Sequence, residues 1–153
     1  VNTESQEGLA ILSEYLSGNI TLKRLKKLAL RVVAVDMMCN GANFSESFNF
    51  LVGHHYVSVD DAYTIVTRVF RGGGLTKDYL YLSGFNKILK MWKSDIDLSP
   101  FLIGKTSIDF YDTISEMIQR GMISKPKYIT KSILNPIEKK DTSIYEYILS
   151  GIN

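Results

Sequence analysis

Apolar residues recur along this chain at the three- and four-residue spacing of amphipathic helices, and short breaks containing glycine, asparagine or proline separate the helical stretches. No stretch alternates apolar and polar residues with the period of two that indicates a half-buried strand. A chain of 153 residues is long enough to bury one hydrophobic core without disulfides or a structural metal. The pattern therefore predicts an all-α fold, a single domain of about six to eight helices.

Capping residues and breaks set the expected helix boundaries. Thr3 or Ser5, Thr21, Thr76 and Ser107 are good N-caps, and Ser58 starts a capping-box-like sequence with two acidic residues in the first turn. The expected helices cover 3–17, 21–39, 43–52, 58–71, 76–93, a short segment near 101, and 107–120. Residues 122–153 are expected to form an irregular, lysine-rich tail with a weak last helix over 143–150.

Composition excludes several classes of protein. One cysteine, Cys39, and two adjacent histidines, His54 and His55, which we place in a loop, cannot form a self-contained zinc finger. The net charge is only +2, and the basic cluster at 23–27 has no interleaved aromatic residues, so we expect a solvated helix face and no nucleic-acid partner. No apolar run approaches the ~20 residues that span a bilayer, so no membrane partner is expected. The sparse cysteine content fits a reducing compartment, which favours a cytoplasmic location.

Glu7 and Gly8 form the first unusual feature of the sequence. Glu7 shares a helix face with Ala10, Ile11 and Glu14, and Gly8 lies inside the helix, where glycine costs about 0.5–1 kcal/mol relative to alanine. A glycine at this position makes sense if another backbone or a ligand comes close. Glu7 is then either a candidate site residue or a first-turn glutamate that the helix dipole favours.

Asp36 is the second unusual feature. It falls on the apolar stripe of its helix, four residues after Val32 and three before Cys39. A buried carboxylate needs a partner or must stay protonated. Two readings are open: a structural ion pair with an arginine, or a supporting group that orients a metal ligand.

Basic residues surround a glycine run between the fourth and fifth expected helices. Arg68 and Arg71 lie three residues apart on one helix face, and Lys77 and Tyr81 lie four apart on the next helix. Arginine binds carboxylates through two parallel hydrogen bonds, so this group could hold the anionic end of a substrate. The alternative is an interhelical loop with solvated flanks.

A family resemblance connects several of these segments. The chain resembles the C-terminal part of the family named for its QEGLA motif, which includes bacterial flavohemoglobin expression-modulating proteins and is related to the microtubule-associated tyrosine carboxypeptidases of animals. The resemblance is carried by 6–10 (QEGLA), 28–36 (LALRVVAVD), 68–73 (RVFRGG), 76–78 (TKD) and 81–84 (YLSG), and more weakly by Gly104-Lys105.

This resemblance implies a zinc metallopeptidase of carboxypeptidase type. In the family, a His-Glu-x-x-x-His element supplies two zinc ligands and the catalytic glutamate, and the glutamate of the QEGLA motif supplies the third ligand, which corresponds to Glu7 here. Asp36 would then hold a zinc-bound histidine through its second ring nitrogen. Arg68, Arg71, Lys77 and Tyr81 would include the groups that bind the terminal carboxylate of a peptide or protein substrate.

The sequence departs from this pattern in one respect: residues 1–153 contain no His-Glu-x-x-x-His element. We therefore expect the chain to be the helical C-terminal portion of a longer protein, with two zinc ligands and the general base upstream of Val1. Zinc is expected in the full-length protein only, and this portion alone is expected to be inactive. An apolar surface around the first helix would then be left exposed and promote self-association. The alternative function is a non-enzymatic regulatory or interaction module, as the bacterial family name suggests.

Overall fold

The computed structural model describes residues 3–55, 57–72 and 75–137. These residues form helices and connecting segments, and no strand occurs among them, so the predicted all-α class is confirmed. The elements are α1 (Thr3–Leu16), α2 (Leu22–Cys39), α3 (Phe44–His55), α4 (Val59–Phe70), α5 (Leu75–Lys93), the 3-10 helices η1 (Ser99–Leu102) and η2 (Ile108–Phe110), α6 (Tyr111–Gln119) and α7 (Lys131–Leu134). Contacts group the chain into two units, 21–79 and the combination of 1–20 with 80–153.

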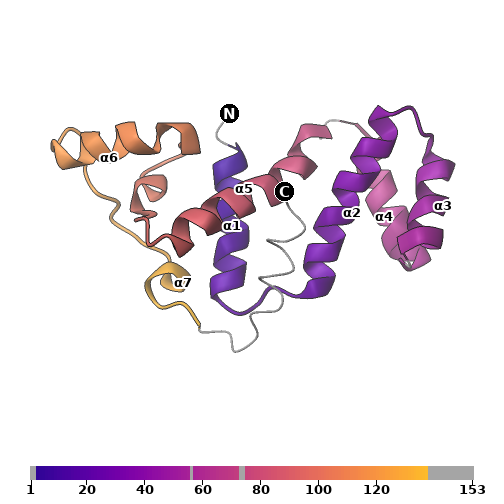
Figure 1. The fold of residues 1–153 in the computed structure, drawn as a ribbon, viewed down its shortest axis with the longest axis horizontal. Coiled ribbons are helices and arrows are strands. Elements are labelled where there is room, and N and C mark those ends of the chain that lie inside the picture. Colours follow the sequence, from indigo (N-terminus) through magenta and orange to yellow (C-terminus); the bar gives the residue numbers. More distant parts are fainter. Residues whose placement is uncertain (1–2, 56, 73–74, 138–153) are drawn as a thin grey trace. The chain divides into compact units, whose positions relative to one another are not determined.

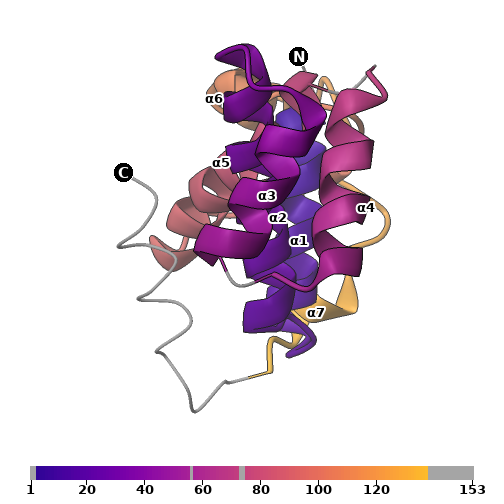
Figure 2. The same ribbon diagram turned by 90° about the vertical axis from the view of Figure 1, so that its right-hand side faces the viewer.

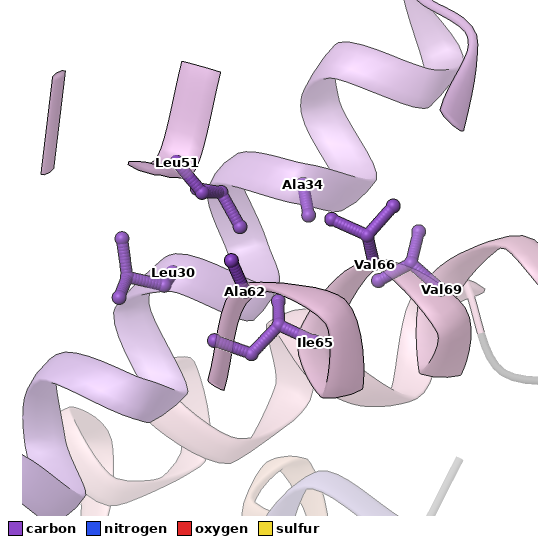
Figure 3. Close-up of a cluster of buried hydrophobic side chains, with 7 residues drawn as sticks. All are labelled: Leu30, Ala34, Leu51, Ala62, Ile65, Val66 and Val69. Atoms are coloured by element: carbon purple, nitrogen blue, oxygen red, sulfur yellow. The ribbon is translucent and has the colours of Figure 1, made fainter. Parts of the chain in front are cut away.

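The unit 21–79 is built around three helices, α2, α3 and α4, which pack against one another (Figure 2). Apolar side chains from all three converge on one core (Figure 3). Its fully buried members are Leu30, Ala34, Leu51, Ala62, Ile65, Val66 and Val69. Aromatic rings close one side of this core, because Phe44 packs edge-on against both Tyr63 and Phe70.

Side-chain caps fix where these three helices begin. The Thr21 hydroxyl accepts a hydrogen bond from the Arg24 backbone N–H, and the Ser58 hydroxyl accepts one from Asp61. Asn43 and Glu46 form a reciprocal capping box, with each side chain accepting from the other residue's backbone N–H at 2.8 and 3.0 Å. The starts expected at Thr21, Ser58 and Asn43 are therefore confirmed.

The second unit contains α1, most of α5, η1, η2, α6 and α7 (Figure 1). Leu9, Ile11, Leu12 and Leu16 of α1 are buried, as are Phe85, Ile88 and Leu89 of α5. These side chains of α1 therefore belong to the core of the unit, and self-association through a surface around the first helix stays a prediction.

The segment after α6 has turns and no regular element over 120–130, and the short helix α7 follows it. Helix α7 packs against α1, and the Ile137 backbone N–H donates to the Leu16 carbonyl at 2.8 Å. Residues 131–137 therefore extend the second unit along the C-terminal end of α1. The weak helix expected over 143–150 lies outside the described residues.

Two expected helix boundaries differ from the structure. His54 and His55 belong to the last turn of α3, so the helix continues past the expected end at residue 52, and both rings pack on Phe50. Helix α5 begins at Leu75, one residue before the expected start at Thr76.

The described part of the chain contains no helix with the length and apolar character that a membrane span requires.

Candidate functional site

Glu7 lies half-buried on α1, directly before a very close contact between two helix backbones. A Cβ atom built on Gly8 would lie 2.9 Å from the Phe85 nitrogen and closer still to the Gly84 carbonyl, whereas ordinary contacts begin near 3.4 Å. Helix α5 likewise has no room for a side chain at Gly84, because its Cβ would lie 3.0 Å from the Glu4 carbonyl carbon. The predicted close approach of another backbone at Gly8 is confirmed, and its partner is α5.

Polar contacts on both sides of this crossing hold α1 in place. The Glu4 carboxylate accepts hydrogen bonds from the Ser83 hydroxyl and, at 2.9 Å, from the Lys87 ammonium. The buried Ser5 hydroxyl accepts from the Ile108 backbone N–H at 2.9 Å. These contacts fix both the position of α1 and its rotation about its axis, and they therefore fix the direction in which Glu7 leaves the helix.

This environment lowers the pKa of the Glu4 carboxyl. Burial raises its pKa, but the hydrogen bonds from Ser83 and Lys87 and the positive charge of Lys87 outweigh burial, so that the pKa lies below its ordinary value of 4.5. Glu4 is therefore ionised at neutral pH and serves as an anchor of the helix crossing.

Glu7 carries a carboxylate suited to a metal, but the described residues do not assemble a complete set of metal ligands around it. No group of three or more His, Cys, Asp or Glu side chains there is arranged to hold an ion. A tetrahedral zinc site with catalytic function needs three protein ligands. Glu7 therefore fits zinc only as one ligand of a set completed by residues outside those described.

Asp36 is exposed, so the expected burial of its carboxylate is wrong. The core cluster of the unit lies on the Leu30 and Ala34 side of α2. Two residues turn an α-helix by about 200°, so Asp36 points away from Ala34. Leu25 lies on the same side of α2 as Asp36. This side is buried at Leu25, near the start of the helix, but it is exposed at Asp36. The expected role of Asp36 beside a metal ligand depended on a buried carboxylate, and the exposure of Asp36 removes that ground.

Arg68 binds a carboxylate of the protein itself. Its Nε–H donates to both carboxylate oxygens of Asp78, at 3.0 and 3.3 Å, and a terminal nitrogen of Arg31 lies 3.8 Å from the same group. The Asp78 side chain is only 4% exposed. This ion-pair cluster joins α2, α4 and the first turn of α5 within one unit.

Sequence reasoning missed Asp78 as the partner of Arg68. The available signal was an acidic residue in the first turn of a helix, ten residues after an arginine. Nothing in that spacing distinguishes a carboxylate that faces the arginine from one that faces water. The contact gives Arg68 a structural role, whereas binding of a substrate carboxylate by Arg68 remains a prediction.

The other residues of the expected carboxylate site differ in exposure. Arg71 is the exposed C-cap of α4, and Lys77 is exposed near the start of α5. Tyr81 is half-buried and lies four residues after Lys77 on the same helix. Their role in substrate binding also remains a prediction.

The basic cluster of α2 is partly engaged in structural contacts. The Lys27 ammonium donates to Asp61 at 2.8 Å, and the Lys26 ammonium donates to the His55 carbonyl at 2.7 Å. The hydrogen bond and charge of Lys27, helped by Lys23, lower the pKa of the Asp61 carboxyl. The expected solvated face therefore also links α2 to the α3–α4 junction.

A cavity of about 410 Å³ opens on the unit that carries Glu7. One wall is the face of α1 formed by Gln6, Leu9, Ala10 and Ser13. The opposite side comes from η1, the loop that follows it and the start of α7. We call this space the α1 cavity. No sequence pattern indicated this cavity, because residues 6–13, 101–105 and 130–133 meet only in the folded chain.

A family model described as microtubule-associated tyrosine carboxypeptidase matches residues 1–150. No curated protein and no solved structure matches the chain significantly. The family match extends past Pro126, beyond the last segment that carried a recognisable sequence resemblance.

Proposed function

The chain belongs to the microtubule-associated tyrosine carboxypeptidase family, and on this basis we propose that it is the C-terminal portion of a carboxypeptidase-like zinc metallopeptidase. The observation that carries this proposal is Glu7, which lies within a QEGLA motif on a helix whose position is fixed by the Gly8–Gly84 contact. The substrate class is the C-terminal end of a peptide or protein.

In this proposal Glu7 is the third protein ligand of a zinc ion, and two histidines and the general base come from a His-Glu-x-x-x-His element outside these residues. Two neutral imidazoles and one carboxylate leave a fourth position open, which is the arrangement of a catalytic site. When bound, zinc supplies Lewis-acid chemistry that polarises the scissile carbonyl and activates a water molecule.

In this proposal, neighbouring residues of the chain hold Glu7 in the position that a zinc ligand needs. A metal ligand must be held within a fraction of an ångström of its working position. The Gly8–Gly84 contact sets the distance between α1 and α5, and the Glu4 contacts with Ser83 and Lys87 set the rotation of α1. Both supports lie within one helical turn of Glu7.

Zinc content of the full-length protein tests the proposal directly. We expect the wild-type protein to contain one zinc per chain and to release C-terminal residues from peptides. Glu7→Ala should lose stoichiometric zinc and activity, whereas Glu14→Ala, a change two turns further along the same helix face, should keep both. Glu7→Ala with unchanged zinc would refute the assignment of this ligand. Wild-type protein without zinc or cleavage would instead favour the regulatory or interaction module.

A further inference from the structure

One segment of the described chain carries positive charge and exposed apolar side chains together. Residues 120–137 connect the end of α6 to α7 and include the residues after α7, and they are drawn in orange and yellow in Figure 1. We call them the basic-apolar segment. It contains no acidic residue, and its basic residues are Arg120, Lys125, Lys127 and Lys131. Its exposed apolar side chains are Met122, Tyr128, Leu134 and Ile137, which are 68%, 86%, 57% and 59% exposed.

Exposed apolar side chains are concentrated in this segment. Among the described residues of the same unit, the only other large apolar side chains that are exposed are Ile96 and Phe110. Single exposed apolar residues are common on protein surfaces and need no explanation. A group of them beside charged residues is typical of an interaction site.

Both ends of the segment are attached to the unit. The Met122 backbone N–H donates to the Met117 carbonyl of α6 at 2.9 Å, and the Ile137 N–H donates to the Leu16 carbonyl of α1 at 2.8 Å. Near the second attachment, Ile133 turns one side of α7 towards the α1 cavity. The exposed side chains therefore lie on the outer side of a connection that is held at both ends.

The lysines of the segment have no acidic partner among the described residues. Arg120 pairs with Glu116 of α6. Lys125, Lys127 and Lys131 are exposed and make no ion pair within that part of the chain. Their positive charge is therefore available to an anionic partner.

The combination of lysines with apolar side chains favours a lipid surface over a protein or a nucleic acid. Lysine is depleted in protein–protein interfaces. Single-stranded nucleic acids are bound by several stacking aromatic side chains, whereas Tyr128 is the one aromatic residue of the segment. At the surface of a bilayer, lysine ammonium groups contact anionic headgroups, while tyrosine and apolar side chains enter the boundary between headgroups and acyl chains.

We propose that the basic-apolar segment binds the surface of a bilayer that contains anionic lipids. Its three lysines contact the lipid headgroups, and Tyr128 enters the headgroup boundary together with the exposed apolar side chains near it. Contact of this kind requires no helix that crosses the bilayer, so it does not conflict with the lack of an apolar run of that length. The inference goes beyond the proposed function and does not depend on it.

Co-sedimentation of the full-length protein with lipid vesicles tests this proposal. The vesicles consist either of phosphatidylcholine alone or of equal amounts of phosphatidylcholine and phosphatidylserine. We expect binding to the mixed vesicles only, and we expect added salt to weaken it, because salt screens interactions between exposed charges. Absence of binding to the mixed vesicles, or equal binding to both kinds, overturns the proposal.

Paired variants show whether this segment makes the contact. Lys127→Gln should weaken binding to the mixed vesicles about fivefold, whereas Lys90→Gln, at an exposed lysine of α5 in the same unit, should bind as the wild type does. Tyr128→Ser should also weaken binding about fivefold, because it removes apolar area that leaves water. Tyr79→Ser, at a tyrosine that is 57% exposed outside the segment, is its control and should bind normally. All four positions are exposed, so thermal unfolding should confirm that the variants fold.

The outcomes separate a lipid surface from an acidic protein partner. Equal binding by Lys127→Gln and Lys90→Gln overturns the proposal, as does unchanged binding by Tyr128→Ser, because the contact would then involve other residues or charge alone. Poly-L-glutamate serves as a model of an acidic protein. If the protein binds it more tightly than the mixed vesicles, and Lys127→Gln weakens that binding, the segment recognises acidic polypeptides and the proposal is overturned.

Discussion

Replacing Gly84 with alanine tests the helix crossing on which the position of Glu7 depends. The new Cβ would lie 3.0 Å from the Glu4 carbonyl carbon and 3.2 Å from the Glu4 Cγ, inside the ordinary contact distance of 3.4 Å. The obstacle is mainly backbone, which cannot turn aside as the end of a flexible side chain can. Helix α1 must therefore move away from α5.

The expected free-energy change combines two opposing effects. Alanine is better than glycine in a helix by about 0.5–1 kcal/mol. Overpacking typically costs about 1–3 kcal/mol, and contact with a helix backbone argues for the upper end of that range. We expect Gly84→Ala to destabilise the protein by about 2 kcal/mol, which corresponds to a fall in Tm of roughly 4–8 °C.

Gly53→Ala is the matched control, because Gly53 is also helical but has no atom within 4 Å of the position its Cβ would take. This variant should be neutral or more stable by about 0.5 kcal/mol. Urea and thermal unfolding of both variants show whether Gly84→Ala lowers the free energy of unfolding while Gly53→Ala leaves it unchanged or raises it. Equal stability of Gly84→Ala and Gly53→Ala would refute the argument that a backbone contact excludes a side chain at Gly84.

Three further predictions follow from the contacts described. Asp78→Asn should destabilise the protein by about 3 kcal/mol in urea unfolding, because it removes the charge of a carboxylate that is only 4% exposed and that Arg68 and Arg31 share. Asp60→Asn, at an exposed first-turn position, should cost under about 1 kcal/mol, and similar costs for the two would argue against the ion-pair cluster. Because the folded-state pKa of Glu4 is lowered, its stabilising effect should be present above its ordinary pKa of 4.5 and be lost as the pH falls through the folded-state pKa. Glu4→Gln should therefore flatten the dependence of unfolding free energy on pH in that range, and an unchanged slope would contradict the assignment. Arg71→Ala should leave stability within about 0.5 kcal/mol of wild type by thermal unfolding, because its side chain is exposed, and any rise in its KM on peptide substrates would then report a role in binding.

Local sequence rules account for the helices. At all three helix starts, side chains three residues away satisfy backbone N–H groups: the cap at Thr21, the cap at Ser58 and the reciprocal pair of Asn43 and Glu46. Such interactions depend on nearby residues alone and can be read without tertiary structure. The end of α3 was not predicted correctly, because the helix continues to His55 without a capping signal there, with His54 and His55 packed on Phe50.

The spacing of apolar residues was a less reliable guide to which face of each helix is buried. A pattern of apolar residues shows that a helix has a buried side, but α2 is buried on different sides along its length, and Asp36 falls where the Leu25 side is exposed. Which part of an apolar stripe is buried depends on how far the neighbouring helices extend along it.

The amino-acid sequence was sufficient to establish the all-α class, most helix boundaries, the family resemblance and the close approach required at Gly8, because each follows from local geometry or a contiguous motif. Only the folded chain could show that Gly84 is the partner of Gly8, that Asp78 binds Arg68, and that Gln6, Phe101 and Lys105 share a cavity. These are contacts between residues distant in the sequence or on different helices. They depend on how helices cross, and no spacing along one helix contains that information.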